Sequence, residues 1–191
     1  MASAARTRRL ATYADLCAVP DHLVAELVAG DLHTSPRPAA PHAMASSALG
    51  AEVVTAFQFG RGGPGGWWII DEPEIHFSDD VLVPDLAGWR RERMPEKPTG
   101  ASFTLAPDWV CEVLSPSTER FDRVSKLPVY ARERVAHAWL VNPIARTLEV
   151  YRLDAGRWLL VTTHGDDALV RAEPFDAVEI DLLHLWGETR A

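Results

Sequence analysis

A mostly apolar stretch with a single charge runs between Pro107 and Pro116, over residues 109–114. In a strand the side chains alternate between two faces. One face would carry Trp109, Cys111 and Val113, and the other would carry Val110, Glu112 and Leu114. Both sets are largely apolar, so the pattern predicts a strand that is covered on both faces of a sheet. An ionised Glu112 in such a strand is costly unless it meets a cation, a metal or a proton.

Two longer segments show the spacing of helices. The first is predicted to begin near residues 41–42, and its apolar stripe consists of Ala43, Leu49, Val53, Val54, Ala56 and Phe57. The second is predicted over about 119–133, with Ser117 or Thr118 as its cap and a bend at Pro128. Shorter helices are predicted at 12–17 and 181–186.

Strand patterns between turn signals recur along the rest of the chain. The predicted strands are two around a Gly30-Asp31 turn within 26–33, then 67–70, 74–77, 81–89, 137–141, 147–153, 157–163 and 176–180. The strand over 81–89 contains Pro84, which indicates an edge position or a bulge. The segments 147–153 and 157–163 are predicted to pair as a hairpin. Loops are predicted at 34–41, 60–66 and 90–104.

The order of these elements indicates the fold class. Strand 109–114, helix 119–133 and strand 137–141 form a strand–helix–strand crossover, which places two central strands parallel. The remaining strands and the helix near 42–57 complete a mixed sheet with helices on both sides. The sequence therefore predicts an α/β or α+β fold, with an additional β-hairpin region at 147–163.

Composition adds limits to this picture. A chain of 191 residues is long enough for one domain over 1–191, and residues 1–9 are expected to be disordered. Its two cysteines lie far apart and are predicted to be free thiols in a reducing, cytoplasmic setting. No apolar run approaches the ~20 residues of a membrane span. The net charge of -8 disfavours broad nucleic-acid binding, although a local basic groove stays compatible with it.

Two carboxylates and a lysine are the candidate chemistry. Asp85 follows a proline in one apolar strand, and Glu112 lies in another. If those strands are neighbours, both carboxylates can point to one side of the sheet and offer oxygen ligands to Mg²⁺ or Mn²⁺. Lys126, on the helix after the Glu112 strand, could reach back over the sheet end. Such a metal would activate water and stabilise charge on a phosphate.

Each residue alone also has an ordinary interpretation. A strand carboxylate such as Asp85 or Glu112 can be an edge residue or a salt-bridge partner. Lys126 alone is typical of a solvated helix position, and His42 is typical of a helix N-terminus. The combination of Asp85, Glu112 and Lys126 in order is less easily explained in this way. Spacing by itself leaves both interpretations open.

These motifs resemble the Uma-two family of restriction-endonuclease-like proteins, in the PD-(D/E)XK nuclease superfamily. The resemblance runs from about Tyr13 to Trp186. The matching segments are Glu26–Leu32, Pro41-His42, Val83–Ala87, Glu112–Thr118, Asp122, Lys126-Leu127, Tyr130 and Ala138–Pro143. The segment Glu-Val-Leu-Ser-Pro-Ser-Thr followed by a lysine and a tyrosine is the most specific of them. The others are specific mainly through their order.

The resemblance implies a restriction-endonuclease-like fold and a set of site residues. Asp85, Glu112 and the Val113 carbonyl would hold the metal. The superfamily's usual lysine position, two residues after the acid, is occupied by Leu114, so the resemblance assigns that role to Lys126. Two further residues are implied at the site: Glu26, on or near the first core helix, as a ligand through water, and His42. Asn142 stands where the family usually has Asp, and it is expected to be a turn residue.

The implied activity is Mg²⁺- or Mn²⁺-dependent hydrolysis of DNA phosphodiester bonds, with Lys126 positioning or helping to deprotonate water. On this hypothesis a Lys126→Ala change is expected to abolish cleavage and leave the fold intact. The alternative is a catalytically inactive nuclease-fold module that binds nucleic acid or protein. A hydrolase of another phosphorylated substrate is a third possibility. A homodimer is expected because nucleases of this kind make two cuts, and no membrane association is expected.

Overall fold

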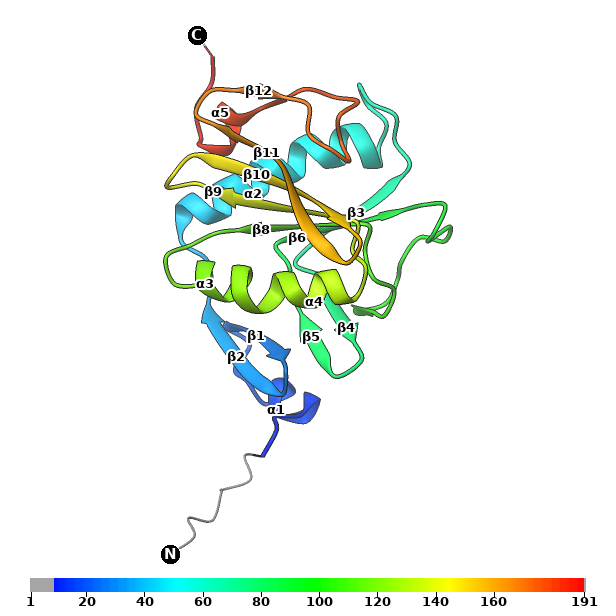
Figure 1. Ribbon diagram of the computed structural model, residues 1–191, viewed down its shortest axis with the longest axis vertical. Helices are drawn as coiled ribbons and strands as arrows, with labels where there is room; N and C mark the ends of the chain where they lie inside the picture. Colours follow the sequence, from blue (N-terminus) through cyan, green and yellow to red (C-terminus); the bar gives the residue numbers. More distant parts are fainter. Residues whose placement is uncertain (1–8, 191) are drawn as a thin grey trace, which may run out of the picture.

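The computed structural model describes residues 9–190, and its centre is a six-stranded mixed sheet with helices on both faces (Figure 1). The strand order is β11-β10-β9-β8-β6-β3. The strands span Trp67–Asp71 (β3), Leu86–Arg90 (β6), Trp109–Val113 (β8), His137–Asn142 (β9), Thr147–Asp154 (β10) and Arg157–Gly165 (β11). Strands β8 and β9 are parallel, whereas the other neighbours are antiparallel. The predicted crossover and hairpin are confirmed.

Helices cover the two faces of this sheet. On one face lies α2 (Ala40–Val53), which continues into the π-helical turn η1 (Val54–Gln58). On the other face lies a helix in three parts: α3 (Glu119–Phe121), the π-helical turn η2 (Asp122–Lys126) and α4 (Leu127–Arg132). The helices predicted near 42–57 and over 119–133 are thus confirmed, with π turns that their spacing did not indicate. Two short helices, α1 (Tyr13–Cys17) and α5 (Leu182–Leu185), complete the set.

A second sheet of five strands has the order β2-β1-β5-β4-β7 and lies below the first in Figure 1. Its strands span Leu23–Val28 (β1), Asp31–Pro36 (β2), Glu74–Phe77 (β4), Asp80–Leu82 (β5) and Ser102–Phe103 (β7). A small pair, β12 (Leu169–Val170) with β13 (Ile180–Asp181), precedes α5. Three predictions were wrong here: β2 extends into the expected loop 34–41, β7 lies in the expected loop 90–104, and the strand expected over 176–180 is only β13.

The single strand predicted over 81–89 is wrong, because the chain changes sheets there. Strand β5 pairs with β1 and β4, whereas β6 pairs with β3 and β8. Pro84 lies in the link and has no N–H to donate, so neither ladder continues through it. This link places Asp85 at the junction of the two sheets.

The side-chain alternation predicted for β8 matches the packing. Trp109, Cys111 and Val113 belong to the core under α2, and Val110 and Leu114 belong to the core under α4. The strand is therefore buried on both faces, as its sequence indicated. Both Cys17 and Cys111 are free.

Three smaller predictions concern the N-terminal residues, the start of α1 and the turn after β9. Of the residues expected to be disordered, 1–8 lie outside the described part, and Arg9 forms an ion pair with Asp15. Thr12 caps α1 in a capping box with Asp15, as predicted for this helix start. Asn142 is a turn residue, since its side-chain oxygen accepts from the N–H groups of Ile144 and Ala145. Within residues 9–190 no helix is long and apolar enough to cross a membrane.

Candidate active site

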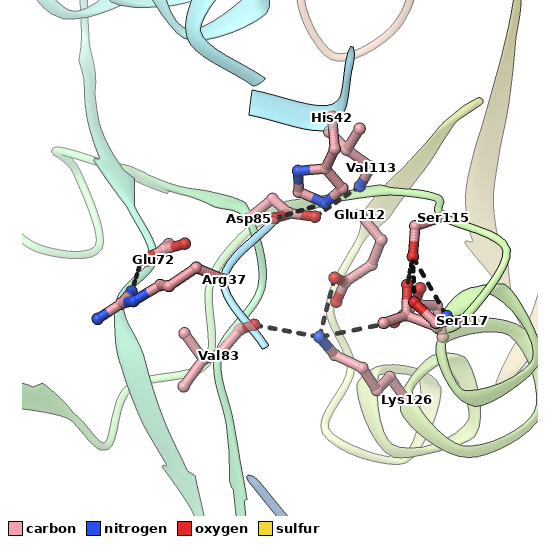
Figure 2. A network of polar contacts seen from close by, with 12 residues as sticks. Arg37, His42, Glu72, Val83, Asp85, Glu112, Val113, Ser115, Ser117 and Lys126 are labelled. Carbon is pink, nitrogen blue, oxygen red and sulfur yellow. Dashed lines mark hydrogen bonds and ion pairs between the residues drawn. The ribbon is translucent and has the colours of Figure 1, made fainter. Parts of the chain in front are cut away.

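A cavity of about 320 Å³ lies where the two sheets, α2 and the η2 turn meet. The cavity is lined by all of the residues proposed from sequence: Glu26, His42, Asp85, Glu112, Val113 and Lys126. Figure 2 shows Asp85 and Glu112 near its centre, with Lys126 below them and His42 above. The structure thus brings together residues from β1, α2, the link between β5 and β6, β8 and η2.

Asp85 connects the end of β8 to the start of α2. One carboxylate oxygen accepts from the Val113 N–H at 2.6 Å, and the other lies 3.2 Å from Nε2 of His42. The preceding proline restricts the chain at the change of sheet, and Leu86 then begins the pairing with β8. These two contacts fix the Asp85 carboxylate beside the Glu112 strand.

Glu112 is buried in β8 with both carboxylate oxygens occupied. Its Oε2 lies 2.8 Å from Nζ of Lys126, and its Oε1 accepts from the Tyr130 hydroxyl at 2.6 Å. Burial raises the pKa of Glu112 well above its ordinary value, and although Lys126 opposes this, the charges of Asp122 and Asp85 add to it. The sequence indicated that a buried Glu112 needs polar partners, and the structure supplies two, the ammonium of Lys126 and the hydroxyl of Tyr130.

Lys126 is only 3% exposed and has three oxygen atoms close to its ammonium group. Nζ donates to Oε2 of Glu112 at 2.8 Å and to the Val83 carbonyl at 3.1 Å, and it forms an ion pair with Oε1 of Glu26 at 3.0 Å. Burial lowers the pKa of Lys126, but the carboxylates of Glu112 and Glu26 outweigh this and raise it well above its ordinary value. The ammonium group is therefore held charged at the centre of the cluster.

This environment changes the expected outcome of replacing Lys126. Removing one partner of a buried ion pair leaves an uncompensated charge and costs about 3–5 kcal/mol. Two buried carboxylates, Glu26 and Glu112, would lose their cation together. The Lys126→Ala variant is therefore expected to lose stability as well as any cleavage, which revises the expectation of an intact fold.

Glu26 lies on β1 and not on a helix, so that part of the expectation was wrong. Its Oε1 accepts from the Val83 N–H at 2.8 Å and lies 3.0 Å from Nζ of Lys126. The residues around Glu26 in the sequence are apolar and include valines, which is typical of a strand. The next residue, Leu27, pairs with Val81 of β5. Glu26 thus connects Val83, in the link between the two sheets, to Lys126.

His42 lies in the first turn of α2, as predicted. Burial lowers its pKa, but the hydrogen bond and charge of Asp85 raise it more, with smaller contributions from Asp122 and Glu72, so the net shift is upward. Its second ring nitrogen, Nδ1, is buried and has no hydrogen-bond partner among the described residues. His42 can therefore orient Asp85 and still offer one polar atom.

Two members of the cluster were not proposed as site residues from sequence. The Asp122 carboxylate lies 3.9 Å from Nζ of Lys126, and Tyr130 donates to Glu112. Burial raises the pKa of Asp122 to about 6, although Lys126 opposes the shift. A sequence signal did exist, because Asp122, Lys126 and Tyr130 recur at intervals of four and so share one side of a helix.

The donor atoms of the cluster suit a divalent cation. The carboxyl groups of Glu26, Glu112 and Asp122 surround the one ammonium of Lys126. Among residues 9–190 no three His, Cys, Asp or Glu side chains are arranged to hold a metal by themselves. Mg²⁺, however, is usually bound by one or two carboxylates, with water and substrate phosphate as its other ligands. Two carboxylates and a carbonyl, all oxygen donors lining one cavity, fit that pattern.

Comparisons with known proteins agree with this fold. A family model described as "Uma2: Putative restriction endonuclease" matches residues 10–183. A crystal structure from Anabaena variabilis ATCC 29413, described as a putative nuclease belonging to DUF820, has a TM-score of 0.74 at 21% identity and covers 93% of this chain and 98% of its own. "Uncharacterized protein slr1290" of Synechocystis sp. (strain ATCC 27184 / PCC 6803 / Kazusa) is 34% identical over 77 residues, which is 39% of this chain and 40% of that protein.

Proposed function

The chain belongs to the Uma2 family, described as putative restriction endonucleases, and from this premise we propose that it is a metal-dependent endonuclease that hydrolyses DNA phosphodiester bonds. The observation that carries the proposal is the set of buried carboxylates around one lysine at the base of an open cavity. Buried ionisable groups with strongly perturbed pKa values, gathered in a cleft, are typical of catalytic sites.

In this proposal Asp85, Glu112 and the Val113 carbonyl hold Mg²⁺ or Mn²⁺. The bound ion supplies a water of lowered pKa and neutralises charge that develops on the phosphate. All three residues line the cavity, and the Asp85 carboxylate is fixed to the Val113 N–H. Lone pairs remain on both carboxylates beyond those used by Lys126, Tyr130 and His42.

The other residues of the cluster have positioning roles. Tyr130 and Lys126 hold the Glu112 carboxylate from its two oxygens, and His42 orients Asp85. Lys126 must exchange one of its three partners before it can hold an attacking water. Glu26 shares its oxygen between Lys126 and the Val83 N–H, so it orients the lysine as that exchange occurs.

The test is a Mn²⁺ titration by calorimetry, run in parallel with a nicking assay on supercoiled DNA. The proteins are wild type, Asp85→Asn, Glu112→Gln and, as a control, Glu96→Gln, which removes an exposed carboxylate in the 91–101 loop. Each substitution removes one negative charge and keeps nearly the same shape. We expect Mn²⁺ binding and nicking to fall together in the first two variants and to stay at the wild-type level in the control.

Other results would favour the competing functions. Mn²⁺ binding by the wild type with no nicking of any DNA would favour a hydrolase of another phosphorylated substrate. No Mn²⁺ binding would favour the catalytically inactive binding module. The structure offers one observation for that module, because the ammonium group of Lys126 is already held by Glu112, Glu26 and the Val83 carbonyl.

Assembly and location complete the proposal. A homodimer would bring two sites to the two strands of a duplex. It is supported by the edge strand β11, where Leu159, Leu160 and Val161 are consecutive and exposed. The free thiols of Cys17 and Cys111 are typical of a reducing compartment, which supports a cytoplasmic location.

A further inference from the structure

Arg37 lies at the entrance of the cavity, in the link between β2 and α2. Its side chain is 58% exposed and lines the cavity with Pro36 and Pro38 on either side. Proline fixes its own φ and restricts the residue before it, so this short segment has little backbone freedom. The guanidinium group is thus carried on a rigid support while its tip reaches solvent.

Arg37 has two partners: its Nη2 donates to the Asp21 carbonyl at 3.4 Å, and its Nη1 pairs with a second residue at the entrance, Glu72. Its carboxylate lies 3.1 Å from the guanidinium and is itself 37% exposed. The backbone N–H of Glu72 donates to the Asp85 carbonyl at 3.1 Å, which ties this ion pair to the candidate metal ligand. Exposed ion pairs are weak because water screens the charges, so another anion can replace Glu72 at little cost.

The rest of the cavity gives an incoming phosphate few free donors. Lys126 is the other lysine or arginine among the described residues that line it, and its ammonium group is already paired with Glu112 and Glu26 and donates to the Val83 carbonyl. The carboxylates of Glu72, Asp85 and Glu112 would repel a phosphodiester. Arg37 is the cation that stands outside this cluster, with solvent on one side.

We propose that Arg37 binds a backbone phosphate of DNA at the entrance of the cavity, and that Glu72 holds its guanidinium until the phosphate arrives. The proposal deepens, and rests on, the proposed nuclease function. A planar guanidinium can bind two phosphate oxygens at once, which gives direction as well as affinity. Figure 2 shows Arg37 on one side of Asp85 and Glu112 and the hydroxyls of Ser115 and Ser117 on the other, so a bound strand would lie across the metal ligands.

The test measures binding of a fluorescein-labelled 20-base-pair duplex by anisotropy, with Ca²⁺ in place of Mg²⁺ so that binding is separated from cleavage. Arg37→Gln is compared with Arg157→Gln, a control that removes an exposed arginine of the β10–β11 hairpin that does not line the cavity. We expect about tenfold weaker binding for Arg37→Gln. Its plot of log affinity against log salt should be shallower by about one unit, the loss of one phosphate contact. Glu72→Gln should bind more tightly than wild type.

The outcomes separate the two proposals. If Arg37→Gln and Arg157→Gln bind alike while wild type still nicks DNA with Mn²⁺, the role of Arg37 is overturned and the nuclease function stands. If Arg37→Gln alone loses binding but wild type never nicks DNA, Arg37 is supported and catalysis is not. Normal binding by Arg37→Gln with lost nicking would also overturn the binding role. Absence of DNA binding by wild type would overturn both.

Discussion

At the scale of single residues, the site depends on side chains whose environment opposes their charge. Glu112, Asp122 and Lys126 are all buried, and the burial of each charged group is tolerable only because the others are near. The sequence identified Glu112 and Lys126 through this conflict, since a charge in an apolar run requires a partner. It did not identify Asp122 as a site residue, because a carboxylate in a helix is ordinary until its burial is known.

The shifted pKa of Asp122 makes a prediction about stability. Its pKa is about 6 in the folded protein and 3.8 ordinarily, so the folded state favours the protonated form. Its contribution to stability is therefore complete below pH 3.8 and is lost as the pH rises through about 6. Relative to an Asp122→Asn variant, wild type should lose about 2 kcal/mol of unfolding free energy between pH 4 and pH 7.

Urea denaturation of both proteins at the two pH values, with a chelator present, checks this. The Asn side chain does not titrate, so all other ionisations are shared between the two proteins to a first approximation. A stability difference that is the same at pH 4 and pH 7 would show that Asp122 has an ordinary pKa and is not under strain from burial.

At the scale of elements, the η2 turn joins the core to the site. The buried Leu127, Val129 and Tyr130 fix the following α4 in the core, while Asp122 and Lys126 face the cavity from the turn itself. A π turn corresponds to an α-helix with one extra residue and is common at functional sites. The spacing predicted a helix here, but hydrophobic periodicity does not register a single inserted residue.

Deleting Val124, which is 57% exposed within η2, tests this view of the turn. The deletion leaves Asp122 and Lys126 three residues apart instead of four and shifts the residues before it by one position along the helix, so the Asp122 carboxylate no longer keeps its present position beside Lys126. We expect the unfolding free energy to fall by about 3 kcal/mol or more, as for a broken buried ion pair. The control Val124→Ala should remain within about 0.5 kcal/mol of wild type. Equal stability of the two variants would contradict the role of the π turn.

At the scale of the whole molecule, one open edge of the large sheet is a candidate interface. Strand β11 pairs on one side only, and a bulge near Val161 turns consecutive apolar side chains outward. Natural proteins commonly protect such edges with charges, but residues 158–163 here carry none. Antiparallel pairing with the same strand of a second copy would satisfy the open backbone groups without like-charge repulsion.

The proposed dimer can be tested by light scattering coupled to gel filtration. Wild type should show twice the 21.1 kDa chain mass, and Leu160→Lys should show the single-chain mass. Leu169→Lys is the matched control, because Leu169 is equally apolar and exposed but belongs to β12. A monomeric wild type, or a dimer that survives Leu160→Lys, would reject this interface.

The sequence by itself determined the local structure and much of the core. The alternation around Glu112 specified a doubly covered strand, the helical spacing after Thr118 specified the crossover, and the family motifs marked Asp85, Glu112, Lys126, Glu26 and His42. The first two of these inferences hold because side-chain periodicity depends on residues close together in the chain, and the roles of the motif residues stay predictions.

Only the tertiary structure decided where the chain changes sheets at Pro84, and that Glu26 reaches Lys126 from a strand. It also decided that Asp122 and Tyr130 join the cluster, and that Arg37 stands at its entrance beside Glu72. The physical reason is that burial and charge pairing depend on contacts between segments far apart in sequence. The Arg37–Glu72 pair joins residues 35 positions apart, and Lys126 meets the Val83 carbonyl across 43.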